Sequence, residues 1–236
     1  MTEKKVKELI ELLKAEKVED RQEAAWNLHK NAEDGKKEVA EAIPALITAI
    51  KDEDWAVRKM SILALGELNV EKLIPTIIDI LKNDLENEVR VGAAEALGDM
   101  KAEQAVPQLI NVLDNSYEML CHVAIFSLSK IGEKATAAVP KLLEFLATPE
   151  EVGFVQTNSL AAMALGEIGD KSAIEPLKDA LNKAAYHEHQ FTIAYSLALI
   201  EGADGAGIAE LKRMKEKFEF INDDLELYEK LLKKFE

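Results

Sequence analysis

The sequence predicts an all-α fold, a right-handed solenoid (α-α superhelix) of about seven antiparallel helix pairs that forms one domain. The first observation behind this prediction is a helical motif that recurs along the chain. The second is a shorter apolar motif that lies between its copies. The third is composition, since the 236 residues include only 11 glycines and 6 prolines. Few glycines and prolines, with abundant alanine, leucine, glutamate and lysine, are typical of helices.

The recurring motif is twelve residues long, and one copy reads VRVGAAEALGDM from Val89. Its ninth residue is leucine in all six copies, and successive copies begin 31 to 37 residues apart. A period in this range indicates a repeat protein in which each unit stacks on its neighbours. The copies begin at Asp20, Val57, Val89, Leu120, Thr157 and His189.

The shorter motif is apolar at helical spacing and carries a proline near its start. Proline is tolerated in the first turn of a helix, because the amide hydrogen that it lacks has no partner there. Each unit is therefore predicted to be a first helix that begins near the proline, a short turn and an alanine-rich second helix. The clear repeats span 18–201, residues 1–17 are expected to supply the first helix of the first pair, and 202–236 a capping pair. The prolines are Pro44, Pro75, Pro107, Pro140 and Pro176.

Small side chains on the second helices are expected to let neighbouring helices approach to about 8–10 Å. Ala93, Ala96 and Leu97 lie on the predicted packing side of the third copy. Gly98 is expected to serve the same packing, although a glycine inside a helix costs about 1 kcal/mol relative to alanine. The turns carry residues suited to helix capping, namely Asp52, Asp54, Asn83, Asp84, Asp114 and Asn115.

Together these features resemble a HEAT repeat of the phycobilin-lyase type, with the motif V-R-x-x-A-A-x-A-L-G-x-I after a proline helix and an aspartate-bearing turn. The resemblance implies a solenoid whose second helices line a concave face. It also implies that Arg21, Arg58 and Arg90, at the second motif position, pair with turn acids of adjacent units. Other residues occupy that position in the later copies, so the C-terminal half is predicted to use different contacts. The replacements are Cys121, Asn158 and Gln190; the third copy matches the motif at Val89, Arg90, Ala93, Ala94, Ala96, Leu97 and Gly98.

Charge and cysteine content bear on partners and compartment. The formal net charge of −15 argues against binding to nucleic acid or to an anionic membrane surface. The single cysteine, Cys121, cannot form an intrachain disulfide, which favours a reducing cytoplasm. The first residues show no signal-peptide pattern, and no apolar run approaches the roughly 18 residues that a membrane span needs.

No catalytic residue, metal ligand or cofactor is predicted. Deoxyhypusine hydroxylase, which this chain resembles in fold, places His-Glu pairs at the third and fourth motif positions, and here only His122 matches. In YHEHQ, His187 and His189 point to different faces of a helix, so they are expected to be capping and solvated residues. The segment GADGAG (202–207) is predicted to be an interhelical loop. Cys121 precedes His122 on a helix, and adjacent helical residues do not face each other.

The third, fourth and seventh motif positions lie opposite the packing side and are called the stripe positions below. Five of the six residues at position seven are large and apolar or aromatic, which predicts a binding surface on the concave face. The alternative is that tight curvature packs these side chains against one another. The residues expected to contact a partner are Trp26, Lys59, Met60, Leu63, Val91, Glu95, His122, Phe126, Ser159, Met163, Phe191 and Tyr195.

The sequence therefore predicts a non-catalytic scaffold that binds a peptide or helix of another protein on its concave face. Because carboxylates surround the stripe positions, the expected partner segment is apolar in the middle and basic at its edges. The alternatives are a bilin-lyase-like chaperone of a small apolar ligand and an accessory subunit of an enzyme complex.

Overall fold

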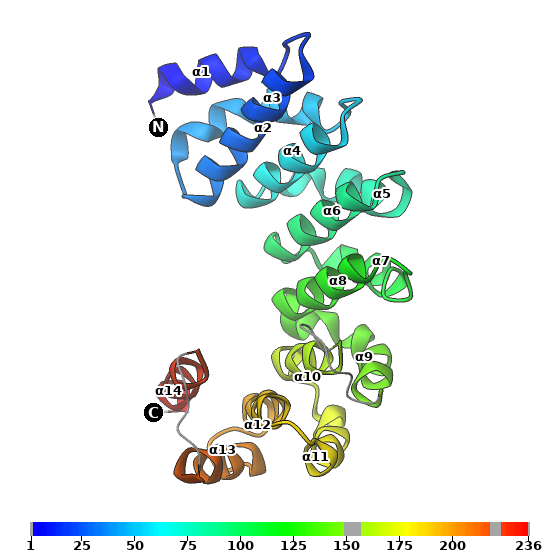
Figure 1. Cartoon of the computed structure of the whole chain (residues 1–236), viewed down its shortest axis with the longest axis vertical. Helices are drawn as coiled ribbons and strands as arrows, with labels where there is room; N and C mark the ends of the chain where they lie inside the picture. The colour runs from blue at the N-terminus through cyan, green and yellow to red at the C-terminus, as the bar shows by residue number, and fades with distance from the viewer. Residues whose placement is uncertain (1, 149–156, 218–222, 236) are drawn as a thin grey trace. The chain divides into compact units, whose positions relative to one another are not determined.

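The computed structural model of the chain describes residues 2–148, 157–217 and 223–235. These residues form helices and connections without any strand, so the predicted all-α fold is confirmed (Figure 1). No helix in the described ranges is both long and apolar enough to cross a membrane. The α-helices are α1 (Glu3–Leu12), α2 (Val18–Glu33), α3 (Ile43–Ala49), α4 (Trp55–Glu67), α5 (Ile74–Asn83), α6 (Asn87–Asp99), α7 (Val106–Asn111), α8 (Glu118–Ile131), α9 (Val139–Leu146), α10 (Thr157–Ile168), α11 (Ile174–Lys183), α12 (His187–Glu201), α13 (Ala206–Lys217) and α14 (Asp223–Phe235).

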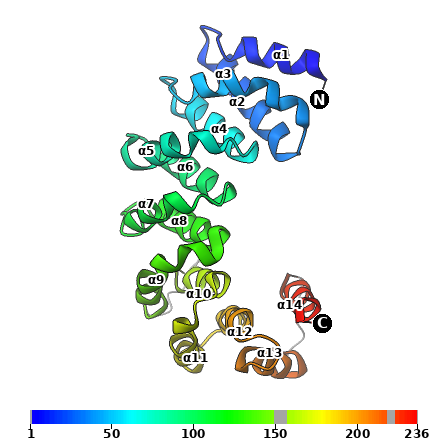
Figure 2. The same ribbon diagram turned by 180° about the vertical axis from the view of Figure 1, so that it is seen from behind.

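The chain divides into two compact units, Met1–Ser127 and Leu128–Glu236, with the boundary inside α8. In the first unit, α5 and α7 lie in one layer and α6 and α8 in a second layer (Figures 1 and 2). In the second unit, α9 and α11 lie in one layer, and α10 and α12 in the other. Each unit is thus built from first helices on one side and second helices on the other, as the two alternating motifs predict.

The first helices begin where the prolines predict. Pro44, Pro75, Pro107 and Pro140 stand within the first two residues of α3, α5, α7 and α9. A short 3-10 helix precedes each of them, and the proline then has no amide hydrogen to leave unpaired in the first turn. The 3-10 helices are η1 (Lys37–Ala42), η2 (Glu71–Leu73), η3 (Glu103–Ala105), η4 (Gly132–Ala138) and η5 (Lys171–Ala173), the last of which leads into α11.

The leucine shared by all copies of the longer motif forms the centre of each repeat. All six of these leucines have no exposed surface, and each contributes about 2 kcal/mol or more through burial. The set is Leu28, Leu65, Leu97, Leu128, Leu165 and Leu197.

Glycine at motif position ten sets the distance between neighbouring second helices within each unit. A β-carbon at Gly98 of α6 would lie 2.8 Å from both Cα and Cβ of Ser127 in α8, which is closer than any real contact. The predicted packing role of Gly98 is therefore confirmed. The same geometry recurs in three pairs, each joining position ten of one helix to position eight of the next. The pairs are Gly66 with Ala96, Gly98 with Ser127, and Gly166 with Ser196.

The arginine ladder implied by the family resemblance is present in the first unit. Arg58 binds both carboxylate oxygens of Asp84, with Nε at 3.0 Å and a terminal nitrogen at 2.9 Å. It also donates to the backbone carbonyls of Asp52 and Glu53. Arg21 repeats this arrangement, with Asp52 as its bidentate partner. Each arginine therefore ties the turn of its own repeat to the turn of the next repeat.

The third arginine is turned toward its own repeat. Arg90 donates to the carbonyl of Leu81 and to the side chain of Asn87. In the next turn, Asn115 stands where Asp52 and Asp84 stand in the preceding turns, so that position presents a neutral amide in place of a carboxylate. The side chain of Asn115 instead closes its own turn by accepting from an amide two residues later, at 2.8 Å.

The turn acids have two distinct roles. Asp54 is the N-cap of α4 and accepts hydrogen bonds from the amides of Ala56 and Val57, as predicted. Asp84 accepts instead from the amide of Glu86 within the turn, and Glu86 occupies the N-cap of α6 without a side-chain cap bond. In both turns, the aspartate that binds arginine also closes the turn by accepting from the amide two residues later, and that later residue is the N-cap of the second helix.

Candidate functional site

The stripe positions of the first unit contain two exposed aromatic side chains. Trp26 of α2 is 54% exposed and Phe126 of α8 is 44% exposed. Both residues occupy motif position seven of their helices. Aromatic side chains of this size carry much of the binding energy at protein interfaces, and Trp is the most enriched type.

Two other stripe residues of this unit are buried, and the expectation that they face a partner is wrong. Leu63 is 6% exposed because it lies over Gly92 of the next second helix, whose missing side chain leaves room for it. Val91 is 5% exposed. At these two positions the burial agrees with the alternative interpretation, that stripe residues pack within the protein. Met60 and Glu95 are partly buried.

Polar stripe residues of the first unit link neighbouring repeats. Gln22 donates to Asp54 at 3.1 Å, which adds to the cap of α4. Lys59 forms an ion pair with Glu88 at 2.9 Å, and the hydroxyl of Tyr117 donates to the other oxygen of the same carboxylate. These hydrogen bonds hold the pKa of Glu88 below its ordinary value, with the Tyr117 bond the larger cause. Lys59 is thus engaged within the protein.

The α8 helix carries one polar stripe residue. His122 is mostly buried, and its Nε2 lies 3.6 Å from a carboxylate oxygen of Glu118 one turn earlier. Its neighbour Cys121 is buried and is not part of a disulfide. Met119 and Phe126 lie seven residues apart on α8, and both are exposed, so they share one face of that helix.

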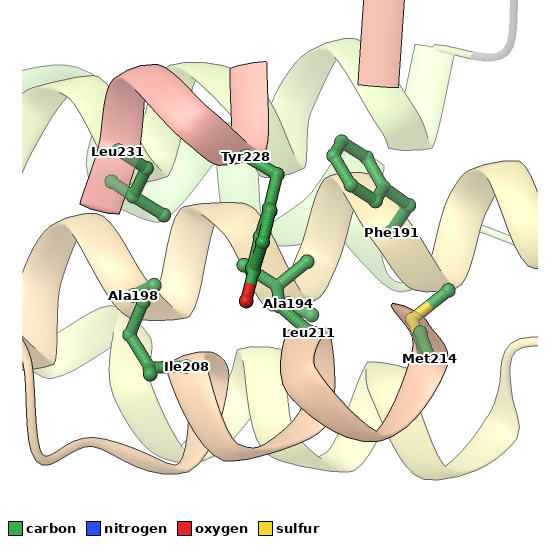
Figure 3. Close-up of a cluster of buried hydrophobic side chains, with 8 residues drawn as sticks. All are labelled: Phe191, Ala194, Ala198, Ile208, Leu211, Met214, Tyr228 and Leu231. Atoms are coloured by element: carbon green, nitrogen blue, oxygen red, sulfur yellow. The ribbon is translucent and has the colours of Figure 1, made fainter. Parts of the chain in front are cut away.

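In the second unit, the C-terminal helices cover the stripe residue Phe191 of α12. Phe191 is 4% exposed, so it is not available to a partner in this structure, contrary to expectation. Its ring stacks on Tyr195 with the centroids 6.3 Å apart. Burial, with a smaller effect of Glu167, raises the pKa of Tyr195. Figure 3 shows Phe191 beside side chains of α13 and α14. On α10, Ser159 and Met163 remain partly exposed.

Both histidines at the start of α12 are predicted to be solvated, and the structure shows this for only one of them. His187 is exposed, and its Nδ1 lies 3.3 Å from a side-chain oxygen of Gln190. His189 is buried, and its Nδ1 lies 2.6 Å from the hydroxyl of Ser159 on α10. It is therefore a packing residue that links two repeats, and its solvated assignment is wrong. Among the described residues, no group of three or more His, Cys, Asp or Glu side chains could hold a metal ion.

The arginine position of the second unit lies beside a cavity that the sequence did not predict. A cavity of about 300 Å³ opens among α9, α10, α11 and the start of α12. Asn158, at the arginine position, and His189 form its buried polar wall, and Lys183 and Asp179 line its rim. Ala184 stands at the position of the ladder aspartates. Loss of an arginine together with the aspartate in the turn of the next repeat is the signal that could have found this space.

Two segments singled out from the sequence remain. The loop predicted over 202–207 ends earlier, because α13 begins at Ala206. A β-carbon at Gly207 would lie 2.3 Å from the backbone nitrogen of Ala198, so this glycine is needed where α13 meets α12. The 37-residue spacing between the copies that begin at Leu120 and Thr157 predicts extra loop over 147–155, and Gly153 and Phe154 in this loop fall outside the described residues.

Comparison with protein families gives two matches. The profile for HEAT repeats matches residues 6–90 and 74–152, which together span more than half of the chain. The profile described as PBS lyase HEAT-like repeat matches residues 160–183. The comparison with curated proteins found no match.

Solved structures of similar fold include natural and designed repeat proteins. The complex of CpcE and CpcF of phycocyanin lyase from Nostoc sp. PCC7120 has a chain with 24% identity and a TM-score of 0.61, over 98% of this chain and 95% of that one. An engineered protein matches with 22% identity and a TM-score of 0.61, over 85% and 97% of the two chains. A designed armadillo repeat protein matches with 18% identity and a TM-score of 0.58, over 82% and 98%. At these identities the likeness establishes the fold alone.

Proposed function

Because the chain belongs to the HEAT repeat family, we propose that it is a non-catalytic scaffold that binds a segment of a partner protein at stripe positions of its second helices. The observation that carries this proposal is the exposure of Trp26 and Phe126 on the second helices of the first unit. Large aromatic side chains are costly to leave in water, and interfaces are enriched in them. HEAT repeats supply such extended binding surfaces by stacking.

The charge of the chain favours a basic partner. The formal net charge is −15, and exposed carboxylates such as Glu19 and Glu23 flank Trp26 on α2. Opposite charge on the partner would speed association and exclude acidic competitors. We therefore propose a partner segment that inserts apolar side chains near Trp26 and places lysine or arginine at its edges.

The test uses the only two tryptophans of the chain, both of which are exposed. Trp26 is a stripe residue, whereas Trp55 is the first residue of α4 and lies outside the stripe positions. Wild type, Trp26→Ala and Trp55→Ala are used as baits with lysate of the source cell, after circular dichroism has shown equal helicity. The expected result is a protein captured by wild type and Trp55→Ala but lost with Trp26→Ala. Equal capture by all three baits would refute the role of Trp26.

A defined partner segment then allows a direct measurement. In a Trp55→Phe variant, Trp26 is the single tryptophan, and docking of an apolar segment on it should shift its emission to shorter wavelength. The matched Trp26→Phe variant retains Trp55 and should show no shift. Weaker binding at higher salt is expected for a basic segment.

A small apolar ligand is the second candidate function, and the cavity beside Asn158 and His189 favours it. Its volume of about 300 Å³ is at the lower limit of known ligand pockets. The similar fold of a phycocyanin lyase complex supports the same idea and also the idea of an accessory subunit in an enzyme complex. An absorbing compound that co-purifies with wild type but not with Asn158→Arg, which fills the cavity, would establish this alternative.

A further inference from the structure

The cavity beside Asn158 lies where the arginine ladder of the first unit has no counterpart. In the first unit, the guanidinium of Arg58 meets the carboxylate of Asp84 between two successive repeats. In the second unit, the corresponding residues are Asn158 and Ala184, and both have shorter side chains. The space of about 300 Å³ among α9, α10, α11 and the start of α12 is next to these two replacements.

Asn158 places a hydrogen-bond donor on the wall of this cavity. The residue is 3% exposed, and its Oδ1 accepts a hydrogen bond from the amide of Ser159 at 2.8 Å. Because a backbone N–H can only donate, this bond identifies the oxygen of the carboxamide, and the other atom is Nδ2. Among the residues that the structure describes, no group accepts a hydrogen bond from Nδ2. A buried donor without an acceptor is unfavourable, and native proteins contain few of them.

Most of the remaining wall is apolar. Two leucines of α9 and two small apolar residues of α11 contribute to it, namely Leu143, Leu146, Pro176 and Ala180. An apolar wall with a few polar groups that point to one place is the usual composition of a site for a small molecule.

The rim of the cavity carries no net charge. Lys183 and Asp179 lie one turn apart on α11 and form an ion pair at 2.5 Å. Because these two charges compensate each other, the rim does not favour a carboxylate or an ammonium over an uncharged molecule. The acceptor that suits Nδ2 of Asn158 is therefore an uncharged oxygen, such as the carbonyl oxygen of a ketone, an ester or an amide.

We propose that this cavity binds a small, uncharged and mostly apolar molecule whose carbonyl oxygen accepts a hydrogen bond from Nδ2 of Asn158. The volume restricts the ligand to the small end of the range that protein pockets bind. This inference deepens the second candidate function, on which it rests, by naming the class of ligand and the residue that selects it. It does not depend on the partner surface at Trp26.

The test compares two probes of the same shape, acetophenone and α-methylstyrene, in which a carbonyl oxygen replaces a methylene group. Binding to the full-length chain is followed by NMR of methyl-labelled leucines, and Leu143 and Leu146 report on the cavity. Wild type should bind acetophenone about three- to tenfold more tightly than α-methylstyrene, which is the effect of one hydrogen bond. Ala180→Phe, which fills the cavity from α11, should abolish binding of both probes.

A reversal of preference separates this role of Asn158 from a purely structural one. Asn158→Asp keeps an acceptor for the amide of Ser159 but puts a carboxylate oxygen in place of Nδ2. This variant should lose its preference for acetophenone and should bind the donor benzamidine about tenfold more tightly than wild type does. The control Asn182→Asp makes the same change at an exposed residue of α11 and should behave as wild type.

Three outcomes would overturn the inference. They are equal affinity of wild type for the two probes, a preference that Asn158→Asp leaves unchanged, and no shift at Leu143 and Leu146 with either probe. If Asn158→Asp does not fold, Asn158→Leu removes the donor at similar volume and should bind the two probes equally. Equal binding of both probes to wild type would leave the second candidate function standing, whereas no binding of either would count against both. Capture that depends on Trp26 should be unchanged in every case.

Discussion

Substitution of alanine for two glycines of α6 should have opposite effects on stability, although the chemical change is the same. Both Gly92 and Gly98 lie inside this helix, so alanine should stabilise each position by about 1 kcal/mol through helix propensity alone. The difference lies in what the new methyl group meets. At Gly92 it meets Cγ of Lys59 at 2.9 Å, a side-chain atom that can shift slightly while the ammonium group stays paired with Glu88. At Gly98 it meets Cα and Cβ of Ser127 at 2.8 Å, and this backbone cannot move without shifting α8.

The expected magnitudes follow from these contacts. Overpacking against a fixed backbone costs about 3 kcal/mol, the upper part of the usual range, so Gly98→Ala should be destabilised by about 2 kcal/mol after the propensity gain. Gly92→Ala should be neutral or more stable by up to about 1 kcal/mol. In thermal unfolding followed by circular dichroism, a change of 1 kcal/mol corresponds to roughly 2–4 °C in Tm for a chain of this length.

Urea unfolding of the same two variants gives an independent free energy of unfolding. Equal stabilisation of Gly98→Ala and Gly92→Ala would refute the conclusion that glycine sets the helix spacing. A loss of stability in both variants would show instead that the contact of Lys59 with α6 is as rigid as that of Ser127.

Two further outcomes are expected. Arg58→Lys keeps the charge but loses the bidentate contact with Asp84, so it should lower the free energy of unfolding by about 1–3 kcal/mol in urea titrations, and a change within error would count against the ladder. The pKa of Glu88 is lowered by hydrogen bonds from Tyr117 and Lys59, so its contribution to stability is present above the ordinary pKa of about 4.5 and is lost as pH falls through the lower folded-state value. Glu88→Gln should therefore be less stable than wild type at neutral pH, and the difference should shrink on acidification; a difference that grows below pH 4.5 would contradict this sign.

The sequence predicts the repeat architecture well because its signals are local. Helical periodicity predicts that the leucine at position nine is buried, and the preference of proline for the first turn predicts where each first helix begins. The structure shows both features as predicted. Periodicity also predicts the side of the helix on which Leu63 and Phe191 lie. It does not say what lies opposite that side.

Burial at those two positions is decided by partners distant in the sequence. Leu63 is covered because the next helix offers Gly92, and Phe191 is covered because α13 and α14 fold back onto α12. Trp26 remains exposed in an equivalent position. Some apolar stripe residues of a solenoid are therefore buried packing residues and others lie on the surface. The three-dimensional structure is needed to tell which are which.

The backbone contact at the glycine positions has a mechanical consequence for the first unit. Second helices that touch through Gly66 and Ala96 have no side-chain layer that could be compressed, since close-packed interiors resist such change. The first helices α5 and α7 instead carry longer buried side chains such as Ile77 and Leu109. Bending within this unit should therefore occur by opening and closing the first-helix side about a stiff row of second helices. Spin-label distance distributions should be broader between α5 and α7 than between α4 and α6, and a reversed order would place the stiff element on the opposite side.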